Sequence, residues 1–171
     1  ADHPDDAGKF AGEVMKRGPG AAARFVKAME ILKANPNVDG SKIAAIGYCF
    51  GGSTVLNMAR QGVDLKGVVS SHGGLGTATP AKKGEVKSRV LVCHGAADKF
   101  IPQTDIDAFK KEMDAAGVSY TFKAYDGATH SFTNPAADSL GKKFNLPIAY
   151  NAAADSSSWS DMKSFFGEIF K

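Results

Sequence analysis

Residues 42–52 read KIAAIGYCFGG and decide how the rest of the chain is interpreted. The run at 42–47 is short and apolar, a pattern typical of a buried strand, and a helix is predicted directly after it, over 51–61. Cys49 lies at the joint, in the G-x-Nuc-x-G arrangement of a nucleophile elbow, with cysteine where serine is commoner. The stretch therefore predicts a strand, a sharp turn and a helix, with a thiol held above the end of the strand.

The residues around Cys49 have predictable tasks in such an elbow. Because the turn is sharp, side chains two residues before and after the nucleophile would collide, which explains Gly47 and Gly51. The positive end of the helix dipole favours the thiolate of Cys49 over the thiol. The backbone N–H of Phe50 points the same way and is predicted to be one oxyanion donor.

Away from the elbow, helices and strands alternate, which predicts βαβ units and a parallel sheet covered on both faces. Thr104 is expected to cap one helix, which ends at Gly117. The last helix is expected to bury a stripe that includes Trp159 and Met162. Strands are predicted at 66–71, 89–93 and 119–125, helices at 5–16, 20–34, 104–117 and from Ser158 onward, and irregular segments at 75–87 and 131–155.

A nucleophile needs a base, and the base needs an acid to orient it. Asp98 follows the strand at 89–93 and His130 follows the strand at 119–125, so both are predicted at the carboxyl rim of the sheet beside Cys49. The order nucleophile, acid, base is that of α/β hydrolases. The sequence thus predicts a Cys49–Asp98–His130 triad.

Other residues compete for these roles. His72 also ends a strand and is ranked as a pocket residue, while His94 follows a strand directly and is interpreted as structural. Asp126 precedes the predicted base by only four residues and is expected to shape the turn. Cys93 alternates with apolar neighbours and is expected in the core.

Composition narrows the function classes. The 171 residues are expected to form one domain over 1–171, with a net charge of +3 and scattered lysines that argue against nucleic-acid binding. No apolar run reaches the roughly 18 residues of a membrane span. Two cysteines are too few for a disulfide framework, which predicts a cytoplasmic location, with the periplasm as the alternative.

Three stretches carry a family resemblance: 43–52 around the elbow, 90–98 with the acid, and 128–134, which reads ATHSFTN. With the tail around Tyr150 and Trp159, they resemble the dienelactone hydrolase family, a branch of the α/β hydrolases that uses cysteine. The resemblance implies a partial α/β-hydrolase fold, with a mostly parallel sheet of about four strands flanked by helices. It also implies hydrolysis of a small ester or lactone through an acyl-thioester, with no cofactor and no metal. Possible pocket residues are Tyr48, His72 and Phe132.

The sequence departs from the family pattern in two places. Residues 131–134 lack the arginine expected shortly after the base, so dienelactone itself is not the expected substrate. Nothing before Lys42 has a strand pattern, so the chain is expected to be the carboxy-terminal portion of the family fold. The edge of the 42–47 strand would then be bare, and it is expected to pair with a missing segment or a second copy.

Two other function classes remain open on the sequence alone. The chain could be a non-catalytic remnant or interaction module, because the strands that supply a second oxyanion donor are not found. It could also be a redox protein in which Cys49 is oxidised rather than acylated.

Overall fold

The computed structural model describes residues 2–16 and 19–171, and the chain divides into two compact units, Ala1–Ile43 and Ala44–Lys171. The first unit holds two helices, α1 (Pro4–Lys16) and α2 (Pro19–Lys33), which confirms the helices predicted at 5–16 and 20–34 to within a residue or so. All predicted site residues lie in the second unit. A single domain over 1–171 stays a prediction.

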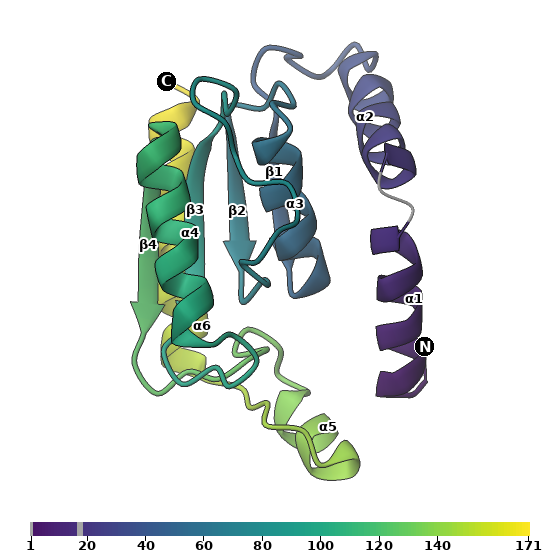
Figure 1. Cartoon of the computed structure of the whole chain (residues 1–171), viewed down its shortest axis with the longest axis vertical. Coiled ribbons are helices and arrows are strands. Elements are labelled where there is room, and N and C mark those ends of the chain that lie inside the picture. The colour runs from purple at the N-terminus through teal and green to yellow at the C-terminus, as the bar shows by residue number, and fades with distance from the viewer. Residues whose placement is uncertain (1, 17–18) are drawn as a thin grey trace. The chain divides into compact units, whose positions relative to one another are not determined.

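The second unit contains a four-stranded sheet in the order β1-β2-β3-β4, with every neighbouring pair parallel (Figure 1). Its register aligns the ends of the first three strands, because Tyr48 lies opposite Ser71 and Ser71 opposite Cys93. The predicted parallel α/β sheet is therefore confirmed. The strands are β1 (Ala44–Tyr48), β2 (Gly67–Ser71), β3 (Arg89–Gly95) and β4 (Tyr120–Tyr125).

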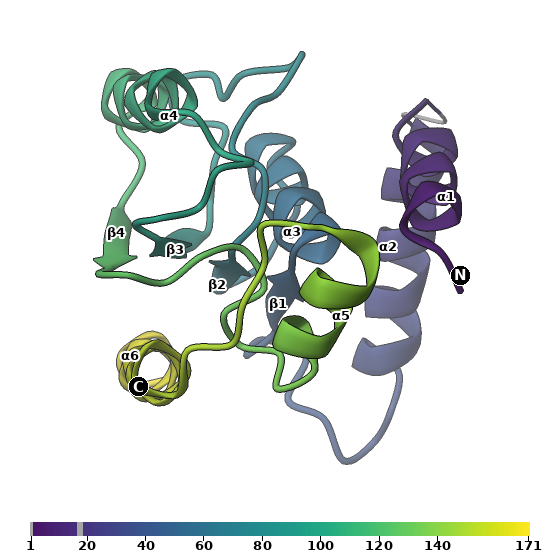
Figure 2. The ribbon, with the colours of Figure 1, turned by 90° about the horizontal axis from the view of Figure 1, so that it is seen from below.

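Helices cover both faces of this sheet. Figure 2 shows α3 (Phe50–Arg60) and α4 (Gln103–Ala116) on one face and α6 (Ala152–Ile169) on the other. On the α6 face, Leu91 and Cys93 of β3 pack in one cluster with Met162 and Phe165. Burial of such side chains supplies the main driving force for the layered arrangement.

The segment predicted to be irregular at 131–155 contains more helix than expected. It includes α5 (Ala137–Phe144), and α6 begins at Ala152 rather than near Ser158. The side chain of Asn151 caps α6 by accepting a hydrogen bond from the Ala154 N–H at 3.0 Å. The first turns of α6 carry alanine and serine instead of large apolar residues, so they show no periodic apolar signal.

Two further local predictions are wrong. Trp159 is 52% exposed, because the buried positions of α6 are Ala154, Ser158, Met162 and Phe165, and Trp159 lies about 100° around the helix from Ser158. Thr104 does not cap α4, which begins at Gln103 after Pro102 and has no side-chain cap. Gly117 does end that helix, in the left-handed conformation.

β1 is an edge strand of the sheet, as expected from the lack of a strand pattern before Lys42, and its mostly unburied residues correct the expectation of a buried strand at 42–47. Its Ile46 and Tyr48 side chains are exposed. An unpaired edge presents free backbone N–H and C=O groups to another strand. Pairing at this edge with a further segment or a second copy stays a prediction.

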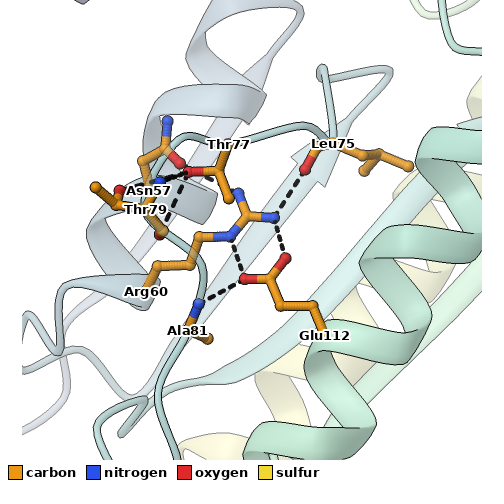
Figure 3. Close-up of polar contacts among 7 residues, drawn as sticks. All are labelled: Asn57, Arg60, Leu75, Thr77, Thr79, Ala81 and Glu112. Carbon is orange, nitrogen blue, oxygen red and sulfur yellow. Dashed lines mark hydrogen bonds and ion pairs between the residues drawn. The ribbon is translucent and has the colours of Figure 1, made fainter.

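A buried ion pair fixes the long connection between β2 and β3. Figure 3 shows the Arg60 guanidinium, which donates to both carboxylate oxygens of Glu112 at 2.8 and 2.9 Å and to the Leu75 carbonyl at 2.7 Å. Glu112 also accepts the Ala81 N–H at 2.7 Å. The connection is therefore tied to α3 and α4 at two points, although the sequence shows it only as a loop.

Replacing Glu112 by alanine is expected to destabilise the protein by about 3–5 kcal/mol, because Arg60 would keep its charge without a partner in the interior. The Arg60 side chain is 1% exposed and the Glu112 side chain 12%. Glu168→Ala removes the exposed Arg89–Glu168 pair and serves as the control, with an expected loss of no more than about 1 kcal/mol. Urea unfolding of the two variants measures the difference, and equal losses would contradict a dominant role for the buried pair.

Candidate active site

The elbow places Cys49 between β1 and α3 in an unusual backbone conformation. Its φ is 51° and its ψ is −119°, a region that residues with a side chain rarely adopt. Such conformations cost about 1–3 kcal/mol and persist where surrounding contacts hold them, often at functional sites. The Cys49 N–H donates to the Ser71 carbonyl at 3.0 Å, which ties the turn to the end of β2.

The two elbow glycines are needed for different reasons. A Cβ at Gly47 would lie 2.1 Å from the carbonyl oxygen of Gly51, so a side chain is sterically impossible there without rearrangement. A Cβ at Gly51 would meet nothing within 4 Å. The prediction that a side chain at Gly51 would collide is therefore wrong. The helix backbone at Gly51 is the obstacle, and only Gly47 has to be small.

We expect Gly47→Ala to destabilise the protein by about 2–3 kcal/mol, because backbone must shift to admit the new methyl group. Gly51→Ala is the matched control. It introduces the same methyl group into open space in a helix, where alanine is favoured over glycine by about 0.5–1 kcal/mol. Thermal melting of both variants tests the difference, and a Gly47→Ala protein as stable as Gly51→Ala would refute the steric argument.

The turns after β3 and β4 bring Asp98 and His130 together. The Ala97 N–H donates to the Ala128 carbonyl at 2.8 Å, and a Cβ at Gly95 would lie 2.6 Å from the same oxygen. The two backbone segments are therefore in close contact, and the glycine permits it. This contact explains how residues 32 positions apart in the chain become hydrogen-bonded.

Two hydrogen bonds join the three predicted triad members in series. His130 Nδ1 lies 2.8 Å from Asp98 Oδ2, and His130 Nε2 lies 3.2 Å from Cys49 Sγ. Asp98 is buried and also accepts the Phe100 N–H at 2.9 Å, while Cys49 is exposed. The structure thus brings together a reachable thiol, an imidazole and a buried carboxylate in the order that acyl transfer requires.

These contacts shift the ionisation of all three groups. The hydrogen bond from His130 lowers the pKa of the Cys49 thiol against the opposing effect of burial, and the Phe50 N–H lowers it further. Burial alone would lower the pKa of His130, but its hydrogen bonds to Asp98 and Cys49 raise it to about 9. Burial would raise the pKa of Asp98, but the bonds from His130 and Phe100 lower it. The electrostatics favour a thiolate–imidazolium pair.

The predicted pocket residues differ in exposure. Tyr48 is exposed beside Cys49, whereas His72 is 4% exposed and Phe132 is fully buried in the core cluster. The rings of His72 and Phe132 are in edge contact, with centroids 5.3 Å apart. A role of these residues in a pocket wall stays a prediction.

Three of the competing residues are not members of the hydrogen-bonded series. His94 lies inside β3 rather than directly after the strand, and it is buried with its ring 5.5 Å from that of Phe122. Asp126 is exposed, and Asp98 takes the position next to His130. Cys93 is buried in the core as predicted, and burial raises the pKa of its thiol to about 11.

Three residues at the site were not singled out in the sequence. Phe100 is half exposed, and its ring meets that of His130 with centroids 5.1 Å apart. Thr133 binds the ring of His72, with 2.9 Å between Oγ1 and Nε2. A Cβ at Gly52 would lie 2.6 Å from Ser70 Oγ, so this glycine allows α3 to approach β2. The double glycine after the elbow was the available signal for Gly52.

Within residues 2–16 and 19–171, no group of three or more His, Cys, Asp and Glu side chains is arranged to hold a metal ion. In the same residues, no helix has the length and apolar character needed to cross a membrane.

Comparison with known proteins identifies the family of the chain. The model of the dienelactone hydrolase family matches residues 1–170. An uncharacterized protein of Caenorhabditis elegans is 34% identical over an alignment of 152 residues that covers 86% of this chain and 92% of that protein. The structure of m3DLH is similar over 100% of this chain and 70% of its own, with a TM-score of 0.89 and 36% identity.

A third match is a dienelactone hydrolase-like promiscuous phosphotriesterase from metagenomic libraries, with a TM-score of 0.73 and 40% identity. It covers 83% of this chain, but this chain spans only 58% of it. The sheet, the flanking helices and these similarities agree on one α/β-hydrolase fold and a hydrolase family. From the family model and these relatives, we conclude that the chain belongs to the dienelactone hydrolase family.

Proposed function

We propose that this protein hydrolyses small carboxylic esters or lactones through a Cys49–His130–Asp98 triad and an acyl-thioester intermediate. The observation that supports this most strongly is the series of two hydrogen bonds, 2.8 and 3.2 Å long, that leads from a buried carboxylate to an exposed thiol. Membership of a hydrolase family supports the reaction class. The triad needs no cofactor for acyl transfer.

In the first half-reaction, the Cys49 thiolate attacks the carbonyl carbon, and the carbonyl π electrons move to oxygen. The Phe50 N–H, which lowers the pKa of the Cys49 thiol, is the proposed donor to this oxyanion. The tetrahedral intermediate collapses with cleavage of the C–O bond, and His130 gives its Nε2 proton to the leaving alkoxide. The products are an alcohol, or the opened end of a lactone, and an acyl group on sulfur.

In the second half-reaction, neutral His130 takes a proton from water, and the hydroxide attacks the thioester carbonyl. The intermediate expels the Cys49 thiolate and releases a carboxylic acid, which restores the thiolate–imidazolium pair. Asp98 keeps a proton on Nδ1 throughout, so that Nε2 faces the reacting atoms. Water enters the reaction once, and no oxidant or reductant is required.

The surroundings of the triad favour substrates without a carboxylate beside the reacting carbonyl. Residues 131–134, directly after the base, read SFTN and hold no arginine. Tyr48 and Phe100 are exposed aromatic side chains whose rings contact His72 and His130 respectively. Neutral esters and lactones with apolar groups are therefore the proposed substrates.

A panel of p-nitrophenyl esters and small lactones tests the proposal with the chain as it stands and with the Cys49→Ala variant as background. Turnover of at least one ester that disappears in the variant is the expected result. No turnover of any member would favour the non-catalytic alternative. Peroxide-dependent oxidation of Cys49 in a protein without esterase activity would favour the redox alternative.

The pH profile of kcat/KM should fall on the alkaline side with an apparent pKa near 9. His130 has its pKa raised to about 9, so the imidazolium that protonates the leaving group persists below that pH and is lost above it. The thiolate is present above the lowered pKa of Cys49, so activity should extend to the acid side of the ordinary thiol range. Rates that keep rising through pH 10 would show that no imidazolium takes part.

Phosphotriesters are a second candidate substrate class. The supporting observation is the 40% identity to the promiscuous phosphotriesterase, although this chain spans 58% of that protein. Attack of the Cys49 thiolate on phosphorus would expel an alkoxide or phenoxide and leave a phosphorylated sulfur. Release of p-nitrophenol from paraoxon, lost in Cys49→Ala, would support this activity, and stable labelling without turnover would restrict it to inhibition.

A further inference from the structure

His72 contacts both the nucleophile and the segment that follows the base. It comes directly after β2, its φ is 40°, and its side chain is buried. Its Nδ1 lies 3.2 Å from the Cys49 backbone nitrogen, and its Nε2 lies 2.9 Å from Thr133 Oγ1. A surface imidazole would make no such pair of contacts, and neither end of the ring is free for solvent.

These contacts determine the protonation of the ring. The Cys49 N–H is a donor that is shared between the Ser71 carbonyl at 3.0 Å and His72 Nδ1 at 3.2 Å, so Nδ1 has to accept and carry no proton. The neutral ring then holds its proton on Nε2, where it donates to Thr133 Oγ1. A second proton on Nδ1 would face the Cys49 N–H and remove that hydrogen bond.

The ring also lies against His130. The centroids of the His72 and His130 rings are 5.1 Å apart in an edge arrangement. The centroid of the Tyr48 ring lies 5.9 Å from that of His72. Burial and then the charge of His130 lower the pKa of His72 to about 4, with Asp98 acting weakly in the opposite direction. His72 therefore stays neutral while His130 gains and loses its proton.

We propose that His72 is a positioning residue that, as a neutral imidazole anchored by Thr133, holds the strained backbone of Cys49 and supports the ring of His130. The inference rests on the proposed function of the triad and adds a residue that does not touch the reacting atoms. Cys49 has a positive φ, and such strain persists only where neighbours hold it. A shift of the Cys49 backbone would lengthen the distance from Sγ to Nε2 on which catalysis depends.

The test uses two substitutions at His72. His72→Phe keeps a ring but removes both hydrogen bonds, whereas His72→Asn keeps an acceptor near the Nδ1 position and tolerates a positive φ. For His72→Phe we expect kcat to fall about 10- to 100-fold with KM changed less than about threefold. His72→Asn should recover a substantial part of kcat. Thr133→Val, which removes only the anchor, should show a smaller loss in the same direction.

Alkylation of Cys49 by iodoacetamide between pH 5 and 10 provides the second measurement. In His72→Phe, the rate at pH 7 should fall at least about fivefold while the limiting rate at high pH is kept, because the thiolate is paired less well with His130. An unchanged alkylation profile with wild-type kcat in folded His72→Phe would overturn the proposal. If His72→Phe does not fold, Thr133→Val decides in its place, and an unchanged profile there would overturn it.

Alkylation requires no ester turnover, so it separates this proposal from the proposed function. An inactive wild-type chain whose Cys49 reactivity still depends on His72 would refute the esterase proposal and leave the positioning role supported. An active chain whose reactivity is independent of His72 and Thr133 would do the reverse.

Discussion

Cys49→Ala is expected to lower ester hydrolysis by about 10⁴-fold or more, because no other exposed thiol adjoins His130 in the described residues. The fold should persist, since the side chain removed is small and exposed. Loss of the Cys49 thiol should also change the pKa of the base, His130. The hydrogen bond to the Cys49 sulfur raises the pKa of His130, so that pKa should fall in the variant, as measured by NMR titration of the imidazole.

Cys93→Ala is the matched control for this variant. Its thiol lies in the core, where burial raises its pKa to about 11, and it takes no part in the proposed reaction. The substitution is expected to cost stability through a small cavity and to leave kcat within about twofold. Retained activity in Cys49→Ala, or equal losses in both variants, would show that Cys49 is not the nucleophile.

The second large effect is expected for Asp98→Asn, with a decrease of about 10³- to 10⁴-fold in kcat. The amide keeps an oxygen for the Phe100 N–H, so the turn should remain intact. It can, however, offer an N–H to His130 Nδ1, which favours the tautomer with its proton on Nε2 and removes the charge that stabilises the imidazolium. The pKa of His130 should fall, and Cys49 alkylation at pH 7 should slow with it.

Asp126→Asn is the control, because Asp126 is an exposed carboxylate four residues before His130. It was the competing acid in the sequence, and we expect it to change kcat by less than about twofold. A larger loss in Asp126→Asn than in Asp98→Asn would reverse the assignment of the acid.

The positions of the three residues of the proposed triad could be predicted from the sequence because parallel strands direct their carboxyl ends to one rim. The ends of β3 and β4 were predicted within two residues, and Asp98 and His130 each follow one of these ends. Because Cys49 follows the end of β1 at the same edge of the sheet, Asp98 and His130 are expected to lie near it. This inference needs only the existence and direction of the strands, which are the features that apolar periodicity predicts best.

Other features could not be predicted because they depend on contacts between distant segments. The bond between His72 and Thr133 joins residues 61 positions apart, and no local pattern marks either residue as its partner. In the sequence, Arg60 is a charged residue near the end of a predicted helix, and nothing local indicates that it pairs with Glu112 in the interior. The buried face of α6 was predicted wrongly for a related reason. Its buried residues near the start of the helix are Ala154 and Ser158, which are small and give no apolar signal.

In the proposed reaction, Cys49 carries the acyl group as a thioester. The most direct measurement is intact and peptide mass spectrometry of the protein quenched in acid during turnover of a p-nitrophenyl ester. We predict a mass increase equal to one acyl group, located on Cys49, removed by hydroxylamine and accumulated further in His130→Ala at high pH, where the thiolate forms without the base. Ester turnover with no acyl group on Cys49, or an acyl group located on another residue, would contradict the account.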